Sequence, residues 1–392
     1  MNLAIIGCGY VADGYGKTIG NYPELKLVGA FDINTSNLES FLRHSPVRAY
    51  ASLAELLADA SVQMVLNLTN PRSHFEVTRS CLEAGKHVYS EKPLAMDADS
   101  ARTLALLAKQ NGVHLACAPC SLLSNSAQTV MHALRNGAIG RVRLVYAEFD
   151  DGMIAPQMSP WNWRNSFGVN WPAKDEFEVG CTFEHAGYVL TWLGAFFGPA
   201  QGVTAFASCQ IPNKGISVDV MAPDFTVGCI EYKDGVVARV TCSLVAPKDK
   251  SITIIGDKGI LSVADVRNDL CPVYLQPTPA QGWRAGVARR INRLRKLLRV
   301  PGAEKEWHIR QRLPLITSRN GKLFDPHKPV DFCRGPAELA ASIRENRPCR
   351  LSAEFAVHIV ELVEALQHPQ RFGNHRQITT NFAPIRPVQT GN

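Results

Sequence analysis

The sequence predicts an α/β N-terminal domain with a doubly wound parallel sheet, followed by an α+β domain with a large, mostly antiparallel open sheet. Three observations predict this fold class. A short apolar run opens the chain and ends in a glycine-rich turn at residues 7–12. Strand-like and helix-like segments then alternate as far as residue 117, which is typical of parallel sheets with crossover helices. Beyond it, extended runs outnumber helices, which favours antiparallel pairing.

The length of 392 residues fits two domains better than a single core. We expect a first domain at residues 1–120 and a second at 121–392. No window approaches the roughly 20 apolar residues of a membrane span, and the N-terminus enters a strand without a basic leader. We therefore expect a cytoplasmic protein. The 11 cysteines have no metal-ligand or framework spacing, which indicates reduced core thiols and no metal site.

The elements of the N-terminal domain follow from apolar runs and from turn and cap residues. Strands are expected at residues 3–6, 25–32, 62–69, 87–91 and 113–117. Helices are expected at residues 35–44, 52–59, 73–84 and 97–111.

The glycine-rich turn reads Gly7-Cys8-Gly9-Tyr10-Val11-Ala12. Gly7 allows a tight turn out of the strand, Gly9 leaves room for a pyrophosphate, and Ala12 lets the next helix pack closely on the sheet. The start of that helix, after Tyr10 and Val11, offers free N–H groups to phosphates. The sequence therefore predicts a dinucleotide-binding Rossmann domain.

Asp32 ends the second strand and is followed by Ile33. A carboxylate there can bind the ribose hydroxyls of an adenosine and would repel a 2′-phosphate. Residues 33–35 contain no Arg or Lys to hold such a phosphate. NAD is therefore the expected cofactor, with NADP as the alternative, while the competing interpretation of Asp32 is a helix cap.

The stretch Ser90-Glu91-Lys92-Pro93 follows the strand at 87–91. In doubly wound sheets ligands bind at the carboxyl ends of strands, so Lys92 can reach both cofactor and substrate. Glu91 is expected to position the cofactor ribose or Lys92. A cis bond before Pro93 would aim the lysine.

The second domain begins with a helix at 127–136, and three more helices are expected at 185–196, 334–345 and 352–367. Strands are expected at 142–149, 202–209, 225–232, 236–244, 251–255 and 260–263, with Asp234-Gly235 at the tip of one hairpin. The tail after residue 368 is rich in Pro, Asn and Arg and is expected to be irregular or wrapped over a neighbour.

Residues 283–300 form a basic amphipathic insertion with seven Arg or Lys and no acidic residue. Without it the chain is near neutral, so overall basicity is no argument for nucleic-acid binding. A helix at 284–299 carries Val287, Ile291, Leu294 and Leu298 on one stripe. It can pack on its own sheet or a sister subunit, or lie on an anionic membrane. We expect the helix to pack on its own sheet or on a sister subunit.

The sequence resembles the Gfo/Idh/MocA oxidoreductases, named for glucose–fructose oxidoreductase and inositol dehydrogenase. The resemblance covers most of the chain and rests on the glycine turn, on Thr69-Asn70-Pro71 with His74, and on residues 84–88 running into Glu91-Lys92-Pro93. Further matches are residues 136–140, residues 254–259, and His185 at the head of a helix.

This resemblance implies an NAD(P)-dependent enzyme that oxidises or reduces a secondary hydroxyl or ketone of a sugar, nucleotide sugar or related polyol. It also implies a homodimer or homotetramer. Thr69, Asn70 and His74 are then expected to line the cofactor. In the Pro- and Trp-rich loop before His185, Trp163 can stack on a ring and Arg164 can hold a phosphate or carboxylate.

Lys92 and His185 are the expected catalytic residues. Partial burial beside a cationic nicotinamide would lower the pKa of Lys92, and His185 can accept or relay the proton. The family often has an Asp four residues before its histidine, where this chain has Cys181, so Glu178 or Glu184 can take that place. Asp150 and Asp151 are candidates for binding sugar hydroxyls.

Two other functions fit the same sequence. One is a non-catalytic, dinucleotide-binding regulatory protein, against which the presence of both Lys92 and His185 argues. The other is a glycoside hydrolase or lyase that recycles its NAD internally, as some members of the family do.

Overall fold

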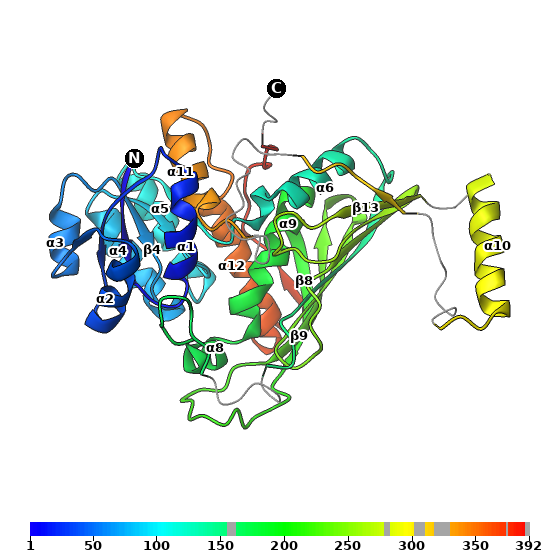
Figure 1. Cartoon of the computed structure of the whole chain (residues 1–392), viewed down its shortest axis with the longest axis horizontal. Helices are drawn as coiled ribbons and strands as arrows, with labels where there is room; N and C mark the ends of the chain where they lie inside the picture. Colours follow the sequence, from blue (N-terminus) through cyan, green and yellow to red (C-terminus); the bar gives the residue numbers. More distant parts are fainter. Residues whose placement is uncertain (155–161, 278–282, 302–309, 317–329, 374, 389–392) are drawn as a thin grey trace.

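The structure is a computed structural model, and it describes residues 1–154, 162–277, 283–301, 310–316, 330–373 and 375–388. The chain forms two sheets that lie side by side, with α11 (Arg334–Arg344) and α12 (Ala353–Gln367) between them (Figure 1). This arrangement confirms the predicted fold class.

Sheet A holds six parallel strands in the order β3-β2-β1-β4-β5-β6. Its apolar strands are buried on both faces, as expected of parallel sheets covered by helices. The strands are β1 (Asn2–Ile6), β2 (Lys26–Phe31), β3 (Arg48–Ala49), β4 (Met64–Asn67), β5 (His87–Ser90) and β6 (Leu115–Cys117). The helices are α1 (Ala12–Thr18), α2 (Thr35–His44), α3 (Leu53–Ala58), α4 (His74–Glu83) and α5 (Ala98–Gln110).

The strand order of sheet A reverses at β1, which pairs with β2 on one side and β4 on the other. Doubly wound sheets bind ligands outside the carboxyl ends of the strands at this reversal. Side-chain caps fix where the helices begin: Asn34, Ser52 and Asp97 each accept a backbone N–H at the start of α2, α3 and α5. The carboxyl ends of the neighbouring parallel strands β1, β4 and β5 lie at one edge of sheet A.

Sheet B has nine strands in the order β14-β13-β12-β11-β7-β10-β9-β8-β15. All its strand pairs are antiparallel except β7 with β10. Asp234 and Gly235 have φ of 65° and 76° at the tip of the predicted β9–β10 hairpin. The strands are β7 (Val142–Asp150), β8 (Ala200–Ser208), β9 (Phe225–Tyr232), β10 (Val237–Ser243), β11 (Ile252–Gly256), β12 (Gly259–Val263), β13 (Val273–Pro277), β14 (Gln311–Arg312) and β15 (His375–Gln377).

One face of sheet B is covered by helices, and the chain before α9 carries a π-helical segment. The elements are α6 (Asn125–Arg135), α8 (Ala173–Val179), the π-helix η4 (Thr182–Ala186) and α9 (Gly187–Phe197). α12 contacts α5 and β6 of the first half as well as β8 and α9 of the second. The buried face of α12 therefore ties the two sheets together.

The tail after α12 is irregular at residues 378–388, as expected, but it also contains one short strand and is packed against the protein. β15 adds a strand to the edge of sheet B beside β8. Ile378, Phe382 and Ile385 are each 7% exposed and belong to the protein's own core. Polar residues separate these apolar residues in the sequence, so composition alone did not indicate that they are buried.

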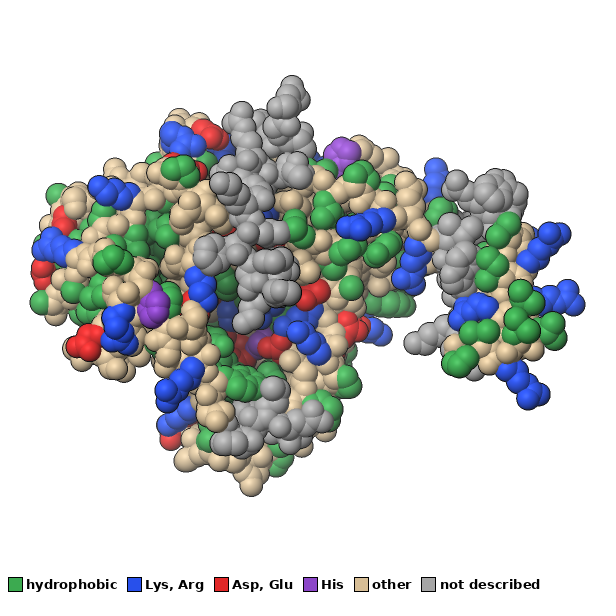
Figure 2. All heavy atoms as spheres, in the orientation of Figure 1, with side chains coloured by type: hydrophobic (Ala, Val, Ile, Leu, Met, Phe, Trp, Pro, Cys, Tyr) green, Lys and Arg blue, Asp and Glu red, His purple; other side chains and the backbone are tan. Residues whose placement is uncertain are grey.

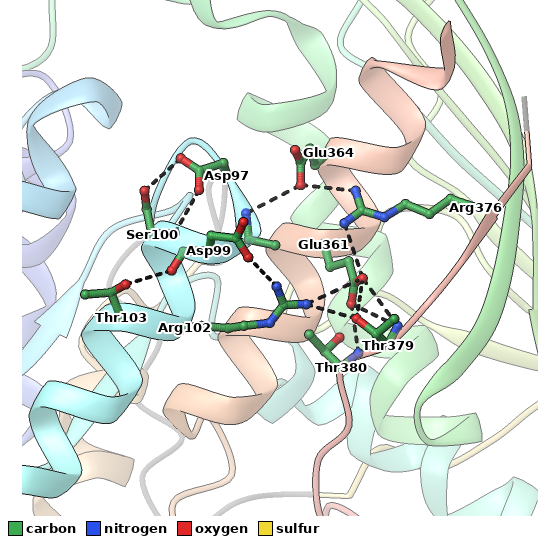
Figure 3. Close-up of polar contacts among 11 residues, drawn as sticks. Asp97, Asp99, Ser100, Arg102, Thr103, Glu361, Glu364, Arg376, Thr379 and Thr380 are labelled. Atoms are coloured by element: carbon green, nitrogen blue, oxygen red, sulfur yellow. Dashed lines mark hydrogen bonds and ion pairs between the residues drawn. The ribbon is translucent and has the colours of Figure 1, made fainter. Parts of the chain in front are cut away.

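Glu361 of α12 is the centre of a polar cluster that joins α5, α12 and the tail (Figure 3). Its carboxylate side chain is 1% exposed and accepts hydrogen bonds from Arg376, Thr379 and the Thr380 N–H, the last at 2.9 Å. Arg102 of α5 lies 3.7 Å away. Burial raises the pKa of Glu361, but the hydrogen bonds from Thr380 and Thr379 outweigh it, so the pKa is lowered.

Replacing Glu361 by alanine is expected to lower the free energy of unfolding by about 3 kcal/mol, because buried donors lose their acceptor. Since the folded pKa is depressed, this contribution is present above the unfolded-state pKa and disappears as pH falls through the folded value. Urea denaturation at neutral and acid pH measures both effects. Glu354→Ala, an exposed position on the same helix, is the control, and an equal loss there would contradict the assignment.

Among the residues that the structure describes, no helix combines the length and apolarity needed to cross a bilayer.

Candidate active site

The loop between β1 and α1 leaves an open surface at the carboxyl edge of sheet A. Gly7 has a φ of +93°, and a Cβ there would lie 2.7 Å from backbone atoms of Leu68 and Thr69, so only glycine fits. A Cβ on Gly9 would meet no atom within 4 Å. This open face fits the pyrophosphate of a dinucleotide.

The Asp32 carboxylate lies against this loop at the end of β2. The Cys8 N–H donates to Oδ2 at 2.6 Å, and the Asn34 N–H donates to Oδ1 at 2.7 Å. A carboxylate oxygen has room for a second donor, and the neighbouring Ile33 is 91% exposed. Asp32 is therefore held in place while remaining able to accept hydrogen bonds from ribose hydroxyls.

Hydrogen bonds link the segment after β4 to α8 on one side and to the chain at Pro93 on the other. Asn70 Nδ2 donates to Asp175 of α8 at 2.7 Å, which links this segment to the second half of the chain. The ring nitrogens of His74 lie 2.6 Å from the Pro93 carbonyl oxygen and 2.9 Å from the Thr69 carbonyl oxygen. His74 therefore lies between the backbone of these two segments, and its ring when neutral donates to one of the two carbonyl oxygens.

The loop at residues 162–171 covers the start of α1, where Tyr10 is 36% exposed and Val11 half-buried. The Asn165 side chain donates to the Tyr10 carbonyl oxygen at 3.0 Å.

Within that loop, the ring of Trp163 lies 4.8 Å from the ring of Trp171. Arg164 Nε donates to Asn170 at 2.9 Å and its side chain is otherwise exposed. The loop thus brings both predicted residues to the dinucleotide edge, and their contact with the cofactor stays a prediction.

Lys92 comes directly after β5, and a cis peptide bond joins it to Pro93, as the sequence suggested. Its Nζ lies 2.5 Å from the carboxylate of Glu184. Glu91 accepts the Tyr15 hydroxyl at 2.7 Å and the Lys92 N–H at 3.1 Å. Glu91 therefore fixes the backbone of the lysine, and Glu184 pairs with its side chain.

The pKa of Lys92 corrects one prediction. Burial alone would lower it, but the charge of Glu184 outweighs burial and raises the pKa above its ordinary value. Lys92 is therefore a cation held beside a carboxylate, which suits it to donate a hydrogen bond rather than to accept a proton. The sequence pattern suggested the opposite because it did not place Glu184 at the lysine.

His185 lies in the π-helix η4, a wide turn often found at functional sites. Its Nε2 is hydrogen-bonded to Glu176 of α8. Its Nδ1 is buried, has no hydrogen-bond partner among the described residues, and lies 3.7 Å from Asp151 Oδ2. The imidazole is thus oriented from one side and left with a free nitrogen on the other.

His185 and Glu176 share one titration. Burial lowers the pKa of His185 to about 3 and raises the pKa of Glu176 well above its ordinary value. Two interacting groups take up protons as a pair. With the pair deprotonated, Nε2–H donates to the carboxylate and Nδ1 is a proton acceptor. After the pair takes up one proton, Nδ1 of His185 carries a hydrogen and can donate it.

A second set of charges surrounds Asp151. Lys250 forms an ion pair with it, and the Lys250 Nζ lies 4.8 Å from the Phe149 ring centre. The guanidinium of Arg267 lies 4.9 Å from the ring centre of Tyr188. Burial raises the pKa of Asp151, but the nearby imidazole of His185 and the cations Lys250 and Arg267 outweigh burial and lower the pKa. The site therefore holds Asp151 ionised beside two cations.

The other predicted carboxylates and the thiol point elsewhere. Asp150 accepts the Ser243 hydroxyl at 2.5 Å. Glu178 lies 3.5 Å from Arg72 and accepts the Asp219 N–H. The Cys181 thiol donates to the Cys242 carbonyl oxygen in the core of sheet B. Of the candidates Asp150, Asp151, Glu178, Cys181 and Glu184, two reach the catalytic pair. Asp151 lies beside His185, and Glu184 lies beside Lys92.

Sequence reasoning missed Glu176, Lys250 and Arg267, which reach the site from α8 and from the loops around β11 and β12. Glu176 lies nine residues before His185, too far for a pattern based on one helical turn. Lys250 and Arg267 lie in a stretch without a motif. No cluster of three or more His, Cys, Asp or Glu has metal-binding geometry within the described ranges.

Comparison with known proteins gives two family matches. The model of the oxidoreductase family with an NAD-binding Rossmann fold matches residues 1–118. The model of the GFO/IDH/MocA C-terminal domain matches residues 127–262. Together they span most of both sheets.

Individual relatives agree with these models. The chain is 26% identical over 270 residues to trans-1,2-dihydrobenzene-1,2-diol dehydrogenase of Mus musculus, covering 67% of this chain and 74% of the relative. It is 22% identical to scyllo-inositol 2-dehydrogenase (NADP(+)) IolW of Bacillus subtilis (strain 168), covering 92% of each. The fold matches the WlbA dehydrogenase from Bordetella pertussis, solved with NADH and UDP-GlcNAcA, with a TM-score of 0.68, 17% identity and coverage of 97% and 98%. The chain belongs to the GFO/IDH/MocA family of NAD(P)-dependent oxidoreductases.

Proposed function

We propose that the protein is an NAD-preferring dehydrogenase that oxidises a secondary hydroxyl, or reduces the matching ketone, of a sugar, nucleotide sugar or related polyol. The observation that carries the proposal is that two groups with opposite pKa shifts, Lys92 and His185, lie near one another. Lys92 is kept cationic by Glu184, and His185 is kept neutral by burial with a free Nδ1. Neighbouring groups with opposed protonation are the usual basis of acid–base assignments.

Bound NAD(P) supplies the hydride acceptor or donor. Gly7, Gly9 and Asp32 would hold it along the carboxyl edge of sheet A, with Glu91 and the segment fixed by His74 beside it. Lys92 donates a hydrogen bond to the reacting oxygen and stabilises the negative charge that develops there. His185 Nδ1 accepts the hydroxyl proton, and Glu176 keeps the imidazole in the tautomer that leaves Nδ1 free.

The substrate class is supported by relatives and by the charges of the site. One relative is named as a diol dehydrogenase, and another is named as an inositol dehydrogenase. Asp151, held ionised, and the Arg267 guanidinium offer an acceptor and donors to a polyhydroxylated ligand. A screen of inositols, aldoses and nucleotide sugars for NADH formation tests the proposal. The absence of NAD(H) and NADP(H) binding by calorimetry would contradict it.

Preference for NAD leads to a prediction about Asp32. Replacing Asp32 by serine is expected to raise the ratio of kcat/KM with NADP to that with NAD at least ~10-fold, because a carboxylate repels the 2′-phosphate at close range. Steady-state kinetics with both cofactors measure this ratio. Asp99→Ser, at an exposed acid on α5, should leave it unchanged. A wild-type enzyme that already prefers NADP would contradict the role of Asp32.

We also propose that the protein forms a homodimer or homotetramer through the open face of sheet B. Leu144, Tyr146 and Phe206 are 40%, 38% and 58% exposed on β7 and β8, which leaves apolar side chains on the face without helices. Light scattering of the purified protein measures the mass in solution.

A further inference from the structure

Helix α10 (Trp283–Leu297) stands at the far end of the molecule, apart from both sheets (Figure 1). Its end is well formed: the Leu298 N–H donates to the Leu294 carbonyl at 2.9 Å, and the Val300 N–H donates to the Arg295 carbonyl at 3.0 Å. Arg299 closes the helix with a φ of 48°, the left-handed conformation of helix C-termini. α10 therefore ends in a regular C-terminal turn and lies away from both sheets.

The apolar face of α10 is exposed to solvent. Val287, Leu294 and Leu298 are 38%, 53% and 65% exposed, and with Ile291 they lie at spacings of three and four residues, which places them on one side of a helix. Figure 2 shows hydrophobic and basic side chains together on this helix. The predicted packing of this stripe on the protein's own sheet is therefore wrong.

The charges of α10 are all of one sign. Residues 283–300 contain seven Arg or Lys and no acid, and outside them basic and acidic residues are equal in number. Arg289, Arg293 and Lys296 are exposed on the side opposite the apolar stripe, and Arg290 is exposed at its flank. Long cationic side chains in such places can extend past an apolar face to reach anionic groups.

We propose that α10 binds the surface of an anionic phospholipid membrane, with Val287, Ile291, Leu294 and Leu298 entering the headgroup boundary and the arginines contacting lipid phosphates. A lipid surface offers an apolar layer and negative charge on the same side, which matches both features of the helix. A nucleic-acid duplex would pair with the cations but leave the leucines in water. The helix lies along the surface and does not cross the membrane, so the enzyme binds reversibly.

The proposal predicts binding that needs charge and apolar contact together. Full-length protein should co-sediment with vesicles of phosphatidylcholine containing phosphatidylglycerol and remain in solution with phosphatidylcholine alone. Salt should weaken the binding, because the attraction between the cations and the anionic surface is screened within a Debye length. Leu294→Glu with Leu298→Glu, and separately Arg289→Glu with Arg293→Glu, should each weaken vesicle binding at least ~10-fold.

The matched control is Leu106→Glu with Lys109→Glu on α5, which replaces an exposed leucine and an exposed lysine on another helix. This variant should bind vesicles like the wild type, and circular dichroism should show that all variants are folded. Equal binding to neutral and anionic vesicles, or unchanged binding by the α10 variants, would overturn the proposal. So would a dimer, measured by sedimentation velocity, that the Leu294→Glu change disrupts, since a second copy would then be the partner.

Discussion

Replacing His185 by alanine is expected to lower kcat for hydroxyl oxidation by about 10²–10⁴-fold, the usual contribution of a positioned base. The physical reason is the free Nδ1 of an imidazole whose other nitrogen is held by Glu176. NADH affinity should change little, because His185 belongs to the second half of the chain. Stopped-flow absorbance of NADH, with fluorescence titration of NADH as the control, separates the two effects.

The hydrogen-bonded dyad of His185 and Glu176 predicts that the rate of oxidation depends on pH. Oxidation needs the deprotonated pair, so kcat/KM should fall as pH drops through the apparent pKa of the dyad. Glu176→Gln should move that fall to lower pH, because the remaining titrating group, His185, has its pKa lowered by burial. A pH–rate profile identical to that of the wild type would show that the dyad does not carry the proton. This readout distinguishes proton transfer from a structural role of Glu176.

Replacing Lys92 by methionine is expected to lower kcat by about 10²–10³-fold, since a preorganised donor to a developing charge is lost. Methionine keeps the length of the chain and leaves Glu184 without its cation. Arginine should restore little activity, because its planar head does not fit a single-donor position. Single-turnover kinetics measure the chemical step. Full activity of Lys92→Met with intact hydride transfer would contradict the role of the lysine.

Much of the fold follows from local features of the sequence. The apolar run before Gly7, the alternation up to residue 117 and the Asp234-Gly235 hairpin each specify an element through short-range physics, and the structure confirms them. The edge strands β3, β14 and β15 were missed because two or three residues carry too little pattern. Their pairing depends on the strand beside them rather than on their own composition.

The site was predictable only where a motif fixes position. Lys92 was proposed because it follows a strand end, and His185 because of the family resemblance. Glu176 and Lys250 were not, because they meet His185 and Asp151 only through the packing of α8 and the β11 edge. The pKa of Lys92 was predicted in the wrong direction for the same reason: it depends on Glu184, a contact between residues 92 positions apart.

We propose that a cationic Lys92 and a neutral His185 act together on a substrate hydroxyl beside NAD(P). The most direct measurement is the rate of NADH formation by the wild type, Lys92→Met and His185→Ala at saturating NAD, on the best substrate of the polyol and nucleotide-sugar screen. The structure predicts turnover by the wild type and a loss of at least ~100-fold in each variant, with NADH binding retained in both. Equal rates in all three proteins would contradict it.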